Sequence, residues 1–151
     1  LHEGSGGAGK QRGGFGVNYK IKLRRGNAKV SMVMDHGRFG PQGVLGGKDG
    51  GVNFVQVEQN GDPYIPAHLS KDQNILVQTG DTIRISTPGG GGYENPFLRY
   101  PDLVRHDVQR GYYTLQEAQE RFGVVLNPQN EVDSKATQKL RKGQSFFNLS
   151  T

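Results

Sequence analysis

Residues 17–24 read VNYKIKLR and alternate strictly between apolar and polar side chains. The apolar members of this stretch are Val17, Tyr19, Ile21 and Leu23. Because successive side chains of a β-strand point to opposite faces, the alternation predicts a strand with one buried face and one basic, solvent-facing side. A strand of this kind needs partner strands, and the sequence offers several.

Strand-like patterns continue in four further segments, residues 30–35, 52–58, 75–78 and 82–86. The turn residues 25–27 (RGN) predict a hairpin of the first two strands, and 79–81 (TGD) predict another of the last two. Asn60-Gly61 is the strongest hairpin signal, leading to a short return strand at Tyr64, although Asp62-Pro63 can shift its turn.

The hydrophobic period changes to a helical one after residue 100. Pro101 suits a first helical turn, and Gly111 stands where that helix would stop, although His106 and Asp107 within it are expected to be ordinary solvated residues. Thr114-Leu-Gln-Glu117 is a capping box, in which hydroxyl and carboxylate satisfy each other's backbone N–H groups. Two short helices are therefore expected, the second ending at Gly123.

A third helix is expected over residues 133–142, with a short strand before it at 124–126. The fold class that results is α+β and mainly β. We expect an antiparallel sheet or a barrel-like β domain of about five to seven strands, followed by two or three short C-terminal helices.

The 151 residues fit one domain with one core, which should be thin because only 32% of residues are hydrophobic and 24 are glycine. We divide it into an N-terminal glycine-rich loop (1–16), a β-rich core (17–100), a helical part of the same domain (101–142) and a fraying tail (143–151). The start on a glycine-rich loop, without Met or a preceding strand, suggests that the fold has an upstream part.

Composition excludes several classes of protein. Cysteine is absent, which excludes disulfides, thiolate metal sites and cysteine nucleophiles and favours the cytoplasm. No apolar run is long enough for a membrane span. The net charge of +5 lies mainly in residues 1–50, partly on the solvent side of the first strand, so we weigh nucleic-acid binding as a minor alternative.

Three glycine-rich stretches stand out, residues 4–16, 37–51 and 89–92. Glycine lacks a Cβ atom, so its backbone can take positive φ angles or approach another surface closely. The tetraglycine run in particular needs a special reason, because glycine weakens β-structure. The stretches could line a ligand cleft, anchor on another domain, or join strands of a twisted sheet.

Neither the one apparent nucleotide-binding motif nor the histidines of this sequence fit a functional site. Gly4 to Lys10 resembles a phosphate-binding P-loop, but Gln11 replaces the required Ser or Thr, and neither a preceding strand nor a following helix is expected. The four histidines are scattered, and the adjacent Asp35 and His36 would point to opposite faces of a strand, so turn formation by Asp35 is the better interpretation. No catalytic residue and no metal ligand is assigned.

The glycine stretches carry a resemblance. In order, GSGGAGKQRGGFG, GRFGPQGVLGGKDGG, GDTIRISTPGGGGYENP and LVRHDVQRGYYTLQEAQERFGVVL resemble the C-terminal region of hydantoinase B/oxoprolinase family proteins, over roughly residues 4–142. The positions that match the family motifs are Arg12, Gly13, Gly14, Arg38, Gly46, Gly47, Gly89, Gly90, Gly91, Gly92 and Tyr93. Many relatives have proline and tryptophan after the Arg-Phe of the central stretch, where this chain has Gly40-Pro41-Gln42, which leaves the substrate open.

The resemblance implies part of a B-type subunit of an ATP-dependent hydantoinase or oxoprolinase, which opens cyclic amides. An acetone- or acetophenone-type carboxylase subunit is the alternative, and an independent anion- or RNA-binding module is a second one. In the family, a partner phosphorylates a carbonyl oxygen with ATP. The resemblance therefore implies an A-type ATP-binding subunit and the upstream remainder of the B-type subunit as partners, with ATP, Mg²⁺ and possible divalent-metal sites outside this chain. The isolated chain is expected to be inactive.

Overall fold

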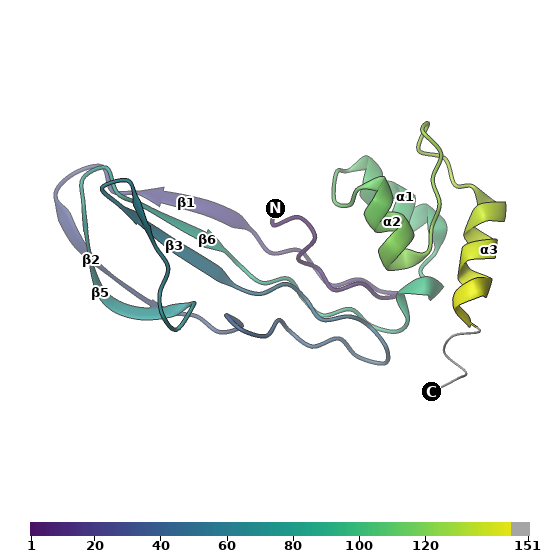
Figure 1. Ribbon diagram of the computed structural model, residues 1–151, viewed down its shortest axis with the longest axis horizontal. Coiled ribbons are helices and arrows are strands. Elements are labelled where there is room, and N and C mark those ends of the chain that lie inside the picture. Colours follow the sequence, from purple (N-terminus) through teal and green to yellow (C-terminus); the bar gives the residue numbers. More distant parts are fainter. Residues whose placement is uncertain (146–151) are drawn as a thin grey trace.

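The computed structural model describes residues 1–145 as an elongated molecule (Figure 1). Strands gather at one end, helices at the other, and long segments without regular secondary structure run between them. The elements in chain order are β1 Asn18–Lys22, β2 Asn27–Val33, β3 Phe54–Gln59, β4 Asp62–Tyr64, β5 Lys71–Gln78, β6 Thr82–Ser86, the 3₁₀ helix η1 Pro96–Leu98, α1 Pro101–Gln109, α2 Leu115–Phe122 and α3 Ser134–Ser145.

The strands form two antiparallel sheets. The larger sheet has the order β1-β6-β3-β4, and the smaller one pairs β2 with β5. The predicted hairpins of β1 with β2 and of β5 with β6 are therefore wrong. The turns at residues 25–26 and 79–80 instead carry the chain from one sheet to the other, and they lie side by side, since the Thr79 hydroxyl donates to the Gly26 carbonyl (3.2 Å).

The hairpin predicted at Asn60-Gly61 is confirmed. Both residues have positive φ angles, 51° and 90°, as a two-residue turn of type I′ requires. Asp62-Pro63 does not shift the turn, because Gln59 pairs with Asp62. Pro63 lies in β4, the edge strand, where its missing N–H removes no bond that the sheet needs.

The apolar faces of the two sheets pack against each other, and this cluster makes the core of the β end. Its buried members are Met32, Val55, Val57, Ile75, Val77 and Ile85. A separate cluster lies among the helices, made of Ala8, Val104, Tyr113, Ala118, Phe122 and Val124. The chain thus has two small cores in place of the single one expected, because a middle section rich in glycine has few apolar side chains to join them.

The helices follow their sequence signals. Pro101 occupies the first turn of α1. The Thr114–Glu117 capping box is formed at the start of α2, and Gly123 ends that helix with a left-handed φ of 60°. The strand expected at 124–126 is not formed among the described residues, which show only an isolated bridge of Leu126 with Val132. Of the expected tail, residues 146–151 lie outside the described part.

The α+β, mainly β class is confirmed, with six antiparallel strands followed by three C-terminal helices. The barrel-like option is not what forms, since the two sheets do not close on each other within residues 1–145. Over the same residues, none of the helices is both long and apolar enough to cross a membrane.

Candidate functional site

The three glycine-rich stretches meet in the middle of the molecule. They supply five segments that run along its long axis between the strands and the helices (Figure 1), residues 5–9, 11–16, 40–44, 47–51 and 87–93. We call these five segments the glycine bundle. Segment 87–93, which contains the tetraglycine run, lies at its centre.

Segment 87–93 exchanges backbone hydrogen bonds with all four of the other segments. The bonds are Gly7 N to Gly90 O (2.9 Å), Gly90 N to Gly14 O (2.9 Å), Gly92 N to Lys48 O (2.8 Å) and Val44 N to Gly92 O (2.9 Å). A strand in a sheet has at most two neighbours, one on each side. The glycine bundle is therefore not a sheet but a three-dimensional packing of backbones.

This packing explains why many of these residues are glycines. A Cβ atom on Gly13 would lie 1.9 Å from the Gly90 carbonyl oxygen, and one on Gly91 would lie 2.0 Å from the Gln42 oxygen. A Cβ atom on Gly47 or Gly89 would likewise lie 2.1 Å from a carbonyl oxygen of another bundle segment. None of the three uses considered for the stretches included this one, in which the glycines of one stretch pack on the backbones of the others.

The Arg12 side chain extends from the glycine bundle to α1, where it forms a bidentate salt bridge with Asp107. Its Nε donates to Asp107 Oδ2 at 2.9 Å and its Nη2 to Oδ1 at 3.1 Å. The bond to this carboxylate raises the pKa of Arg12. The Arg12 guanidinium also lies over the Phe15 ring, 4.5 Å from its centroid, which adds a cation–π contact.

Asp107 is only 4% exposed, so the expectation of a solvated helix residue was wrong. Arg99, also buried, donates from Nη2 to Asp107 Oδ2 (3.0 Å) and from Nη1 to the Lys10 carbonyl (3.2 Å). We call Arg12, Asp107 and Arg99 the ion cluster. It ties the glycine bundle to the residue after η1 and to α1, and a paired carboxylate is how a buried charge is normally tolerated.

The sequence does contain a signal for the burial of Asp107. Asp107 follows the buried Val104 by three residues and Leu103 by four, which places it on the face assigned to the core. A charge on the core side of a helix indicates a buried partner. Arg99 carried no comparable signal, because it lies outside any periodic element.

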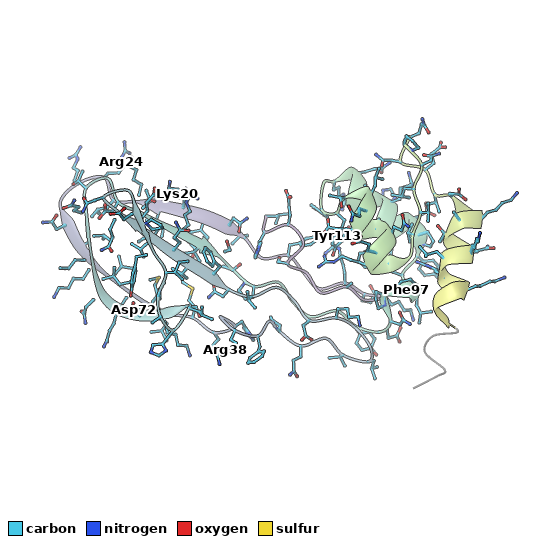
Figure 2. All side chains as sticks on the ribbon, viewed as in Figure 1. Lys20, Arg24, Arg38, Asp72, Phe97 and Tyr113 are labelled. Carbon is cyan, nitrogen blue, oxygen red and sulfur yellow. The ribbon has the colours of Figure 1, made fainter. Side chains whose placement is uncertain are left out.

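The other predicted positions are placed differently. Arg38 is exposed and lies toward the β end, far from Tyr113 and Phe97 at the helical end (Figure 2). Tyr93 exchanges two backbone bonds with Gln11, but the residue remains 46% exposed. Gly46 forms a turn with a φ of 88° beside the bundle. The structure thus brings Arg12, Gly13, Gly14, Gly47 and the tetraglycine run together, but not Arg38.

The Asp35-His36 pair lies at a bend that follows β2, and turn formation by Asp35 stays a prediction. His36 has a φ of 61°, and its Nδ1 lies 3.2 Å from the Phe39 carbonyl oxygen. Asp35 pairs with Lys71 at 3.0 Å, and this contact lowers the pKa of Asp35. Within residues 1–145, no three His, Asp or Glu side chains gather as metal ligands would.

A pocket of about 620 Å³ opens between the bundle and the helical end. It is lined by Ala8, Gly46, Lys48, Asp49, Asn95, Pro96, Phe97, Glu120, Arg121 and Arg141. Its lining carries both acidic and basic side chains, and some of them already have hydrogen-bond partners within the chain. Asp49 accepts a bond from the Gly43 N–H, and Arg121 donates to the Gly4 carbonyl. The pocket thus lies at the junction of the glycine bundle and the helices.

Comparison with known proteins identifies the family. The hydantoinase B/oxoprolinase family model matches residues 1–96, and the chain belongs to that family. It is 32% identical over 142 residues to a protein of Pseudomonas sp. (strain NS671) designated as the B-type subunit of a D-/L-hydantoinase, covering 94% of this chain and 24% of that one. It is 31% identical over 141 residues to the beta subunit of the caprolactamase of Pseudomonas jessenii, covering 88% and 23%.

The fold is also found in a solved structure. The crystal structure of the ATP-dependent caprolactamase from Pseudomonas jessenii superposes with a TM-score of 0.74 at 24% identity, over 94% of this chain and 25% of that one. This likeness shows the fold alone. The chain spans about a quarter of the length of these relatives, and the match lies in their C-terminal part.

Proposed function

We propose that these residues are the C-terminal domain of a B-type subunit of a cytoplasmic, ATP-dependent enzyme that hydrolyses cyclic amides. The two Pseudomonas relatives are designated for hydantoin and caprolactam, both of which are cyclic amides. Their designations favour hydrolysis over carboxylation. The partners would be the upstream remainder of the subunit and an A-type subunit that binds ATP and Mg²⁺, with any divalent metal held outside residues 1–145.

Within that enzyme we assign a scaffold role to the glycine bundle. The observation that carries this assignment is that most of the family-motif glycines pack on backbone carbonyls of neighbouring bundle segments; these are Gly13, Gly47, Gly89, Gly91 and Gly92. A bundle whose backbones are bonded on several sides cannot slide or bend without losing many bonds together. It would hold the β end and the helical end at a fixed separation, with the ion cluster locking the helical end.

The proposal is tested by measuring ATP-dependent ring opening of hydantoin, 5-oxoproline and caprolactam, with ADP release as the second readout. The complete subunit together with its A-type partner should turn over at least one of the three amides, and the 151-residue chain should turn over none. Turnover by the 151-residue chain alone would overturn the scaffold role. ADP release that none of the three amides stimulates, but a ketone with bicarbonate does, would favour the carboxylase.

A further inference from the structure

Strand β1 has an open edge. It pairs with β6 alone among the described strands, and all five of its residues are exposed. Val17 accepts a bond from the Thr87 N–H (2.9 Å), and Leu23 donates to the Asp81 carbonyl (3.0 Å), so the odd-numbered residues face β6. Backbone groups alternate sides along a strand, and those of Lys20 and Lys22 therefore point to the open edge.

The core-facing side of β1 is also only half covered. Tyr19 pairs with Ile85 across the sheet, and Ile21 with Ile83, which places them on the same face as the core of the β end. Nevertheless Tyr19 is 43% and Ile21 48% exposed. An exposed edge next to an apolar strip is a site where natural proteins add or cover a strand.

The first two residues of the sequence lie next to this open edge. His2 and Gly16 form an antiparallel bridge, with the His2 N–H donating to the Gly16 carbonyl at 2.8 Å. Gly16 lies two residues before β1 and is even-numbered like Lys20 and Lys22. If the alternation of β1 continues back to it, its bond to His2 lies on the open edge and not on the side of β6. The Asn18 side chain then reaches the Leu1 carbonyl (3.4 Å), and Figure 1 shows the N-terminus beside the base of β1.

Resting on the proposed function, we infer that in the complete subunit the residues ahead of Leu1 add a strand antiparallel to β1. The bridge of His2 with Gly16 sets the register, and a chain extended backwards from it passes Asn18, Lys20 and Lys22 in turn. The added strand has alternating side chains. Apolar ones cover Tyr19 and Ile21, and polar ones lie on the opposite face with Lys20 and Lys22. On that face Lys20 already pairs with Glu58 (3.7 Å), and Figure 2 shows Lys20 and Arg24 near each other at the β end.

Residue-resolved amide hydrogen exchange tests the added strand. The Lys20 and Lys22 amides should exchange at least about tenfold more slowly in the complete subunit than in the 151-residue chain. The Tyr19 and Ile21 amides face β6 and serve as the internal control, protected in both proteins. Equal exchange of Lys20 and Lys22 in the two proteins, with Tyr19 and Ile21 protected, would overturn the inference.

A second copy of the chain is the competing occupant. Protection of Lys20 and Lys22 that appears in the 151-residue chain and grows with its concentration would show strand pairing between copies and would also overturn the inference. In the complete subunit, Lys20→Pro removes one outward N–H and should expose Lys22, whereas the matched Lys20→Ala should not. If Lys20→Pro leaves Lys22 protected while Tyr19 and Ile21 stay protected, the added strand is wrong.

The outcome is independent of the proposed activity, because exchange is measured without substrate. Protected Lys20 and Lys22 amides in a subunit that opens no cyclic amide would reject the proposed function and keep the added strand. A subunit that opens a cyclic amide but leaves the Lys20 and Lys22 amides unprotected would keep the proposed function and reject the added strand.

Discussion

Gly13 packs directly on the carbonyl of Gly90, so closely that a Cβ atom at Gly13 would lie 1.9 Å from that oxygen. The next residue, Gly14, has no atom within 4 Å of the same position. The two glycines are adjacent in sequence and belong to the same family motif, yet only one of them needs to be glycine for steric reasons. They form a matched pair for testing the glycine bundle.

Gly13→Ala is expected to destabilise the chain by about 3 kcal/mol or more, because the methyl group meets backbone that cannot rotate away. Gly14→Ala should be neutral or stabilising by up to about 1 kcal/mol, since it only restricts the unfolded chain. Urea unfolding of both variants measures the difference. Equal losses in the two would show that the segments do not pack in this way.

The tetraglycine run offers an independent pair. Gly91→Ala would place a methyl group 2.0 Å from the Gln42 carbonyl oxygen, whereas Gly90→Ala would keep 3.4 Å to the nearest atom, the Gly14 nitrogen. We expect Gly91→Ala to cost about 3 kcal/mol and Gly90→Ala less than about 1 kcal/mol. The midpoint of thermal unfolding, compared at one scan rate, is a sufficient measurement. A larger loss from Gly90→Ala would contradict the arrangement.

The ion cluster should respond unequally to loss of its members. Asp107→Ala leaves two guanidinium groups beside each other without a carboxylate, and we expect it to cost about 3–5 kcal/mol. Arg12→Met leaves Asp107 paired with Arg99 and keeps much of the packing on Phe15, so its cost should be about 1–3 kcal/mol. The free energy of unfolding of each variant gives the ranking, and the reverse order would contradict the central place of Asp107.

Strand positions were predictable from sequence, because a strand that buries one face leaves an alternating pattern, as at Val55 and Val57 of β3. Strand pairing was not. Short loops that contain Gly26 and Gly80 look like hairpin turns, and whether such a turn folds a strand back or passes it to another sheet depends on packing that no local pattern records.

The contacts within the glycine bundle and the ion cluster could not be predicted from the sequence. The contacts of Gly13 with Gly90 and of Arg12 with Asp107 join residues far apart in the chain, and backbone packing of glycine leaves no periodic signature. Family motifs marked Arg12 and the glycines as special, but their physical roles became apparent only when the segments were placed together. Asp107 is different, since its position beside Val104 on the core face could have identified it.

The start of α2 should depend on its capping box. Thr114 accepts a bond from the Glu117 N–H (3.1 Å), and Glu117 accepts from the Thr114 N–H (2.9 Å). Thr114→Ala should cost about 1 kcal/mol, and Thr114→Ser, which keeps the hydroxyl, only a few tenths. Denaturant midpoints measure both. Identical losses would show that the hydroxyl is not used as a cap.

Asp81 should make the β end sensitive to acid. Its carboxylate accepts bonds from the backbone N–H groups of Gln78 (2.8 Å) and Asn60 (2.9 Å), and these bonds lower its pKa below the ordinary value of 3.8. A carboxyl group whose pKa is lower in the folded than in the unfolded state adds stability that is complete above the unfolded pKa, about 3.9. That stability is lost as the pH falls through the folded pKa.

The change that isolates this effect is Asp81→Asn, which keeps the shape but cannot ionise. Other carboxylates with lowered pKa values, among them Asp72 and Glu58, contribute to both proteins and cancel in the difference. The free energy of unfolding of the unsubstituted chain minus that of Asp81→Asn should be constant from about pH 7 to pH 5 and should shrink steadily below about pH 4. A difference that stays constant down to about pH 2 would mean that the two backbone bonds do not favour the charged carboxylate.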